Sequence, residues 1–229
     1  VFGGAVAKNT NIRTQDENVD NRKLQNIEEK VAIAKYAASL IQSGDFVYID
    51  AGTSTELVID YIKVMNVTFV TNSLTHAKKL SDKGYTVYIL GGEFKSTTEA
   101  IVGEEAVETL DKYNFTKGFW GTNGVNITKG FTTPEVKEAM VKKKSMENCK
   151  ERYVLADSSK FSQISSVKFS EFDNATIITT ELKNASYKKY KKVKGEFSKK
   201  INESIVRNRS ANTDLQYGKM KLNNNRCKM

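Results

Sequence analysis

Short β-rich segments and amphipathic helical segments alternate along the middle of the chain. Apolar residues recur at helical spacing over 26–41, and the β-rich run 46–50 then leads through the small residues 51–55 into an amphipathic stretch at 56–62. The pattern continues with strands at 67–71, 85–90, 118–122, 152–157 and 175–179 and helices at 74–80, 102–110 and 134–148. The strands are apolar throughout, which is typical of parallel strands covered on both faces. We therefore predict an α/β fold, a Rossmann-like open, mostly parallel sheet with helices on both faces.

The positive charge of the chain is confined to its C-terminal end. The 229 residues carry a formal net charge of +9, which suggests a nucleic-acid partner at first sight. Residues 183–229 alone hold 14 basic and three acidic residues, so the rest of the chain is nearly neutral. We predict a polar linker at 1–25, a globular domain at 26–182 and a disordered basic tail at 183–229. The alternative for the tail is an arm that binds nucleic acid through phosphate contacts.

Composition also excludes several classes of protein. No uncharged apolar run approaches 18 residues, so we expect no membrane contact. Two cysteines and one histidine cannot supply a disulfide framework, and they leave little material for a metal site. The chain starts at Val1 without a signal-like segment, and we expect a fragment of a cytoplasmic protein.

A phosphate-friendly segment follows the first predicted strand. Gly52 lets the backbone approach a ligand closely, Thr53, Ser54 and Thr55 offer hydroxyl groups, and the next helix begins there with unpaired N–H groups. The segment matches neither the Walker pattern nor the dinucleotide fingerprint, so no nucleotide cofactor is indicated. The alternative is a hydroxyl-rich helix cap without a ligand.

Small polar residues also follow the other predicted strands, at 71–73, 91–92, 121–124 and 157–160. Parallel topology places these segments on one rim of the sheet, as a phosphorylated polyol would require. Glu138 and Lys142 share one helical face, and their spacing alone predicts an ordinary surface salt bridge. We place His76 on a helix surface, and Phe119 and Trp120 in the core.

Several motifs, taken in order, resemble the C-terminal sensor domain of the DeoR family of bacterial transcriptional repressors. The similarity extends from about residue 26 to 180, and residues 2–6 (FGGAV) fit the segment that usually follows the DNA-binding region. The matching motifs are 50–55 (DAGTST), 70–73 (VTNS), 90–92 (LGG), 102–103 (VG), 121–125 (GTNGV), 130–134 (GFTTP), 138–142 (EAMVK) and 156–161 (ADSSKF).

The resemblance implies a fold similar to ribose-5-phosphate isomerase and the CoA-transferase-like group. It also implies a regulator, not an enzyme, that senses a phosphorylated sugar and binds operator DNA more weakly with the sugar bound. Carried over by motif, the phosphate would contact Gly52, Thr53, Ser54 and Thr55. The sugar would be lined by Asp50, Asn72, Gly92, Lys95, Gly121, Asn123, Glu138, Lys142 and Lys160. No catalytic residue, metal or cofactor is implied.

The sequence departs from the family pattern at both ends. No winged helix-turn-helix precedes Val1, so we expect operator DNA to be bound only through a missing N-terminal domain. After Thr180 the family supplies a short helix and a closing strand, which 182–190 match only loosely. We expect a homo-oligomer, either a dimer or a tetramer. The alternative function is a sugar-phosphate isomerase on the same fold, with Glu138 as its base.

Overall fold

A parallel sheet forms the centre of the computed structural model, which describes residues 12–180, 185–190 and 192–194. Its seven strands lie in the order β14-β13-β10-β7-β2-β3-β4, and every neighbouring pair is parallel. The strands are β2 (Phe46–Ile49), β3 (Thr68–Thr71), β4 (Thr86–Ile89), β7 (Phe115–Gly121), β10 (Cys149–Leu155), β13 (Thr176–Ile178) and β14 (Val193–Lys194). The predicted α/β class is confirmed, with most strand bounds within a few residues of the expected ones.

The strand order reverses between β2 and β7. The chain proceeds from β2 outward to β3 and β4, then crosses back to place β7 on the other side of β2 and continues outward to β14. Ile49 at the end of β2 is in register with Phe119 of β7, so the loops that follow these two strands diverge from neighbouring points. In open α/β sheets such a reversal leaves a crevice at the carboxyl ends of the strands, where ligands bind.

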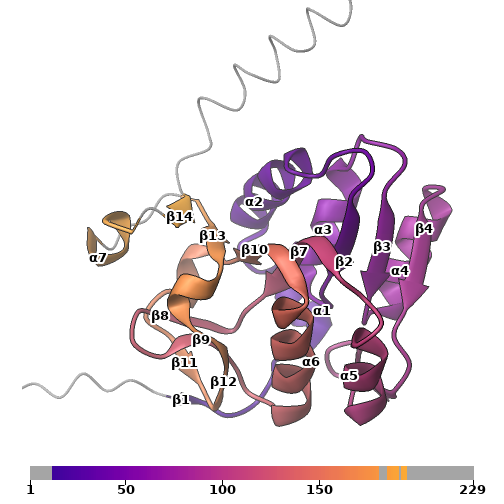
Figure 1. The fold of residues 1–229 in the computed structure, drawn as a ribbon. Helices are drawn as coiled ribbons and strands as arrows, with labels where there is room; N and C mark the ends of the chain where they lie inside the picture. Colours follow the sequence, from indigo (N-terminus) through magenta and orange to yellow (C-terminus); the bar gives the residue numbers. More distant parts are fainter. Residues whose placement is uncertain (1–11, 181–184, 191, 195–229) are drawn as a thin grey trace, which may run out of the picture. The chain divides into compact units, whose positions relative to one another are not determined.

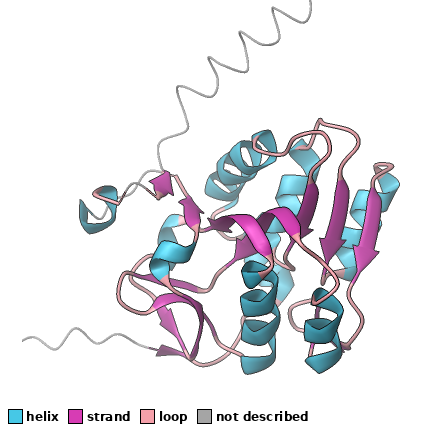
Figure 2. Cartoon of the chain, in the orientation of Figure 1, coloured by secondary structure: helices cyan, strands magenta, loops and turns pink. Residues whose placement is uncertain are grey.

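Helices cover both faces of this sheet (Figures 1 and 2). One face carries α2 (Ile27–Ser39), α3 (Thr53–Tyr61) and α4 (Leu74–Asp82), and the other carries α5 (Glu104–Leu110) and α6 (Val136–Glu147). On the α6 side, the buried indole of Trp120 donates a hydrogen bond to Ser145 Oγ at 2.9 Å. Phe119 is equally buried, as expected. Within the described residues, no helix has the length and apolar character needed to cross a bilayer.

Short strands outside the main sheet were not predicted. An antiparallel sheet joins β8 (Gly124–Asn126), β9 (Gly130–Thr133) and β12 (Val167–Ser170), and a hairpin joins β5 (Glu93–Lys95) to β6 (Ala100–Val102). Residues 100–102 therefore belong to a strand, and the helix expected from 102 begins at Glu104. Strands of three or four residues are too short to show a clear alternation, which explains the omission.

The expected linker at 1–25 contains regular structure where it is described. Residues 1–11 lie outside the described residues, but β1 (Ile12–Arg13) pairs with β11 (Ile164–Ser165), and α1 (Val19–Leu24) follows. Asn18 caps α1 by accepting a hydrogen bond from the Asp20 N–H at 2.9 Å. A six-residue helix with one buried residue, Val19, has no detectable period, which is why the sequence indicates only a polar segment here.

The region expected to be a disordered tail, 183–229, contains regular structure where it is described. Its residues 195–229 lie outside the described residues, whereas α7 (Ala185–Lys188) and the edge strand β14 belong to the fold. They supply the short helix and closing strand that the family resemblance implied. Tyr187 is buried, packs edge-on against Phe161 at 4.9 Å, and donates a hydrogen bond to the Val125 carbonyl at 3.1 Å. Lysine-rich composition concealed this anchoring residue.

The anchoring role of Tyr187 can be measured by urea unfolding. Tyr187→Ala removes a buried ring and its hydrogen bond, and we expect a loss of about 3 kcal/mol in the free energy of unfolding. Lys188→Ala, on the exposed side of α7, is the control and should change it by less than about 0.5 kcal/mol. Equal effects of the two substitutions would show that the fold ends before α7.

Candidate functional site

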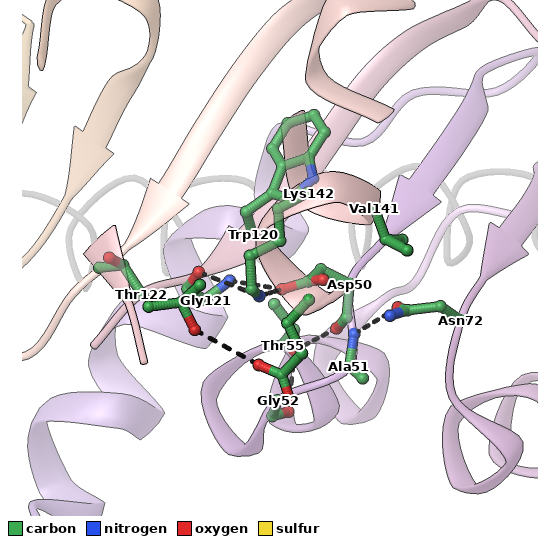
Figure 3. Close-up of polar contacts among 12 residues, drawn as sticks. Asp50, Ala51, Gly52, Thr55, Asn72, Trp120, Gly121, Thr122, Val141 and Lys142 are labelled. Carbon is green, nitrogen blue, oxygen red and sulfur yellow. Dashed lines mark hydrogen bonds and ion pairs between the residues drawn. The ribbon is translucent and has the colours of Figure 1, made fainter. Parts of the chain in front are cut away.

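The carboxylate of Asp50 lies directly after β2 and contacts two residues that line the crevice, Gly121 and Lys142. Its side chain is fully buried. Its Oδ2 atom accepts a hydrogen bond from the Gly121 N–H at 3.2 Å and forms an ion pair with the Lys142 ammonium (Figure 3). Burial raises the pKa of Asp50, against the opposing effect of Lys142. The contacts join the ends of β2 and β7 to α6 at the point where the strand order reverses.

Two predicted ligand-binding residues instead shape the loop after β2. The Asn72 side chain accepts a hydrogen bond from the Ala51 N–H at 2.8 Å and donates one to the Ile101 carbonyl at 3.3 Å. Thr55 Oγ1 donates to the carbonyls of Asp50 and Gly52, at 2.6 and 2.8 Å. Asn72 and Thr55 are buried, and their side-chain polar atoms form hydrogen bonds with backbone groups. Both residues therefore lie behind the crevice wall rather than on it.

His76 contradicts the expectation of a surface residue. It is buried in α4 and makes a backbone hydrogen bond with Gly52. Burial, reinforced by the charge of Lys79, lowers the pKa of His76 to about 3, so the imidazole is neutral at physiological pH. The histidine therefore supports the loop after β2 as a packed, uncharged group.

One end of the crevice is positively charged. Lys30 and Lys160 line it together with Arg22 and the first residues of α3, Thr53 and Ser54. The Lys30 ammonium donates to Thr53 Oγ1 at 3.0 Å and to the carbonyl of Arg22. Burial, together with the neighbouring cations, lowers the pKa of both lysines, although the charge of Asp157 opposes this. Among the described residues, no carboxylate lies within ion-pair distance of these three cations.

The N-terminus of α3 opens at the same end. Gly52 is the N-cap residue of α3. Because glycine has no side chain, Gly52 cannot form a side-chain hydrogen bond to the N–H groups of the first turn. Such N–H groups lack partners within the helix and carry the positive end of its dipole. Thr53 and Ser54, both on the crevice wall, place this helix end next to Lys30 and Lys160.

The other end of the crevice is built around Glu138. Its Oε1 accepts hydrogen bonds from Thr98 Oγ1 at 2.6 Å and Lys95 Nζ at 3.1 Å, and its Oε2 accepts one from Thr133 Oγ1 at 3.3 Å. Burial by itself would raise the pKa of Glu138, but the charges of Lys142 and Lys95 outweigh it and hold that pKa below its usual value of 4.5. Glu138 is therefore an ionised hydrogen-bond acceptor.

The expected surface salt bridge between Glu138 and Lys142 is absent. Both side chains are buried, and Lys142 pairs with Asp50 while Glu138 pairs with Lys95. The helical spacing correctly places the two residues on one face of α6. That face points into the crevice because α6 packs over the main sheet. In this buried position each side chain forms an ion pair with a residue from another segment instead of with the other.

Lys95 lies among three carboxylates behind the crevice wall. Its ammonium is 2.7 Å from Asp16 and 3.1 Å from Glu138, and it also pairs with Glu135. These acidic groups lie close enough together to hold a metal ion, but the Lys95 ammonium takes the place of the cation. Although burial opposes it, the contacts with Asp16 and Glu135 raise the pKa of Lys95.

Gly92 does not line the crevice either. It adopts a φ of +132°, and a Cβ at this position would come within 2.6 Å of the Val102 carbonyl oxygen. Its role is close packing of the segment before β5 against β6. Gly92 and Lys95 therefore join Asp50 and Asn72 as predicted sugar-lining residues that do not themselves line the crevice wall.

The crevice wall combines predicted and unpredicted residues. The predicted residues on it are Gly52, Thr53, Ser54, Gly121, Asn123, Glu138, Lys142 and Lys160. Thr122 and Asp157 on the wall belong to rim segments that the sequence predicted, and the polar residues missed altogether are Arg22, Gln25, Lys30 and Thr98. Lys30 had a detectable signal, because it lies three and four positions before the apolar residues Ile33 and Ala34, on the buried face of α2. Arg22 and Gln25 had none, because α1 shows no period.

A polar crevice at the strand reversal of a doubly wound sheet defines a ligand-binding α/β domain, and its relatives specify the class further. The family model of the DeoR C terminal sensor domain matches residues 25–182. The chain is 42% identical to an uncharacterized HTH-type transcriptional regulator, FruR, of Bacillus subtilis, over 83% of this chain and 75% of the relative. It is 33% identical to the lactose phosphotransferase system repressor of Staphylococcus aureus, over 79% and 72%. The chain belongs to the DeoR family and carries the effector-binding domain of a transcriptional repressor.

Solved structures with a similar arrangement are more distant. Ribose 5-phosphate isomerase A from Methanocaldococcus jannaschii aligns with a TM-score of 0.45 at 18% identity, covering 60% of this chain and 55% of that one. The tetrameric eIF2B-beta2-delta2 complex from C. thermophilum aligns with a TM-score of 0.48 at 14% identity, covering 67% and 54%. The matched region spans about half the length of these proteins.

The buried pair of Asp50 and Lys142 predicts a large loss of stability when one partner is removed. Lys142→Met leaves a buried carboxylate without its ammonium, and we expect urea unfolding at pH 7 to show a loss of about 3–5 kcal/mol. Lys78→Met, which breaks an exposed pair with Asp82, should cost less than about 1 kcal/mol. A Lys142→Met loss no larger than that of the control would contradict the assigned pairing.

The lowered pKa of Glu138 predicts a defined pH dependence. Because the folded-state pKa lies below the usual 4.5, the ionised form stabilises the fold above pH 4.5, and this contribution is lost as the pH falls through the folded-state pKa. The measurement is the difference in free energy of unfolding between the unaltered chain and Glu138→Gln from pH 7 to 3. We expect the difference to shrink on acidification, and growth of the difference would contradict the assignment.

Proposed function

We propose that the crevice binds a phosphorylated sugar, with the phosphoryl group at the end formed by α3, Lys30 and Lys160. The observation that carries this proposal is the gathering of the buried Lys30 and the half-buried Lys160 beside an open helix N-terminus, without a carboxylate ion pair among the described residues. Burial and neighbouring positive charges lower the pKa of these lysines, so a bound dianion would relieve an unfavourable arrangement. Helix N-termini with adjacent cations are general phosphate sites.

The opposite end of the crevice has the chemistry for a polyol. Glu138 is an ionised acceptor for hydroxyl groups, and Asn123 and Thr122 add an amide and a hydroxyl on the same wall. The Lys142 ammonium lies between this end and Asp50. A ligand that is anionic at one end and rich in hydroxyl groups at the other fits both ends. The name of one relative, a lactose phosphotransferase system repressor, agrees with a sugar phosphate.

Binding of this effector would control operator DNA rather than produce a reaction. The named relatives are HTH-type regulators and repressors, so we propose that a helix-turn-helix region reads the operator and that the effector weakens this binding. Such regulation proceeds in the cytoplasm and in a homo-oligomer, a dimer or tetramer, whose subunits set the spacing of the DNA-binding regions. We place the sensor unit at 12–194 rather than at 26–182, because α1 and β14 complete it.

An isomerase function remains the second candidate, since Glu138 provides a buried carboxylate on the crevice wall. Aldose–ketose isomerisation requires a base whose pKa lies near the working pH. The lowered pKa of Glu138 and its three hydrogen-bond donors favour a binding role instead. Conversion of ribose 5-phosphate by the chain, abolished in Glu138→Gln, would establish the enzyme and overturn the regulator.

Calorimetry with a panel of sugar phosphates tests the proposed effector class. We expect at least one saturable ligand, and Lys160→Gln should weaken its binding by about tenfold through loss of a charged contact to the phosphoryl group. Lys168→Gln is the matched control, because Lys168 is an exposed lysine paired with Glu171 and should leave affinity unchanged. Absence of binding at millimolar concentration, or equal affinities in the two variants, would contradict the proposal.

A further inference from the structure

Residues 12–25, here called the strap, run from β1 to the start of α2. At its beginning, the Arg13 carbonyl accepts a hydrogen bond from the Ser166 N–H at 3.2 Å, next to the pairing of β1 with β11. Further on, the Val19 N–H donates to the Thr97 carbonyl at 3.1 Å, and the Val19 side chain is buried. Arg22 of α1 and Gln25, the residue after it, line the crevice. The strap thus follows the carboxyl edge of the sheet, where the crevice lies.

Asp16 fastens the middle of the strap. Its carboxylate accepts an ion pair from Lys95 at 2.7 Å and a hydrogen bond from the Asn123 amide at 3.2 Å, and only 4% of its side chain is exposed. Lys95 lies behind the crevice wall, so an anion bound beside α3 would leave this fastening in place. The strap is therefore already held over the polyol end before any ligand arrives.

Arg22 is the residue of the strap that faces the positively charged end. It lines the crevice with Lys30, and its backbone carbonyl accepts a hydrogen bond from the Lys30 ammonium. The Nε atom of Arg22 is buried and has no hydrogen-bond partner among the described residues. Buried donors in native proteins are nearly always paired, and an unpaired guanidinium donor in a crevice suits an anionic ligand.

The charge of Arg22 also acts on the two lysines of the positively charged end. The positive charge of Arg22 is among the causes that lower the pKa of both Lys30 and Lys160, after burial. These three cations come from α1, α2 and the turn Ser158–Lys160, which are separate elements of the chain. Asp157 is the carboxylate that most opposes this lowering of the two pKa values. Its side chain accepts hydrogen bonds from Asn26 and Ser159 rather than forming an ion pair with these cations. A bound dianion would supply the anionic partner that these three cations do not have among the described residues.

We propose that Arg22 is a further anion-binding residue, contributed by the strap, and that effector binding tightens the strap onto the sensor domain. The inference rests on the proposed function, since it takes the phosphoryl group of the effector as the partner of Arg22. The strap leads back to residues 2–6, which resemble the segment that follows the DNA-binding region in the family. A contact on the strap therefore lies on the covalent path along which occupancy of the crevice would reach a DNA-binding region.

Calorimetry with inorganic phosphate and with ribose 5-phosphate tests the contact itself. Arg22→Gln should weaken the binding of both probes by about tenfold, because the lost contact is to the phosphoryl group that they share. Lys23→Gln is the matched control, since it removes one positive charge from the same helix but its ammonium faces Glu56 and Glu99, at 3.6 and 3.9 Å. Arg22→Lys, which keeps the charge but loses the planar fork, should lie between them.

Hydrogen exchange separates this inference from the proposed function. In the unaltered chain at saturating probe, amide exchange should slow in residues 52–56 and in the strap. In Arg22→Gln at saturation, exchange should slow in 52–56 alone. In the unaltered chain, protection of 52–56 without protection of the strap would overturn the role of Arg22, as would equal affinities of Arg22→Gln and Lys23→Gln. Absence of binding and of protection in the unaltered chain at tens of millimolar probe would instead overturn the phosphate site.

Discussion

The structure depends on one buried charge, the Asp50 carboxylate at the end of β2. A carboxylate without solvent must be compensated, and here the Gly121 N–H and the Lys142 ammonium do so. These partners belong to β7 and α6, which follow β2 by about 70 and 90 residues, so satisfying one side chain fixes three distant segments at the strand reversal. The crevice exists where it does because the loops after β2 and β7 diverge from this point.

Pairing inside the crevice then determines its electrostatic character. Lys142 forms an ion pair with Asp50, and Lys95 forms ion pairs with Asp16 and Glu138. The acidic and basic groups of the polyol end therefore neutralise each other. The lysines beside α3 have no such partners among the described residues, which leaves that end positively charged. This polarity arises locally in a nearly neutral domain, since the excess charge of the chain belongs to residues 183–229.

The main sheet was predictable because its strands and helices have clear apolar patterns, and parallel topology by itself brought the polar strand ends to one rim. The family resemblance added Glu138 and Lys142, whose spacing alone predicted a surface pair. Pattern could not reveal that burial would pair Lys142 with Asp50, which is distant in sequence. It also could not reveal the strap, because α1 buries a single residue, Val19. Tyr187 was hidden by the lysine-rich sequence around it, although its ring is buried and packs against Phe161.

The central claim is that the uncapped start of α3 and the lysines around it form the receptor for a phosphoryl group. A crystal structure of the chain grown with a saturating sugar phosphate tests this claim most directly. The account predicts electron density for the phosphoryl group within hydrogen-bond distance of the N–H groups of residues 53–55 and of the Lys160 ammonium. Density for the phosphoryl group in the separate groove lined by Lys143, Arg152 and Lys168, with the crevice empty, would contradict it.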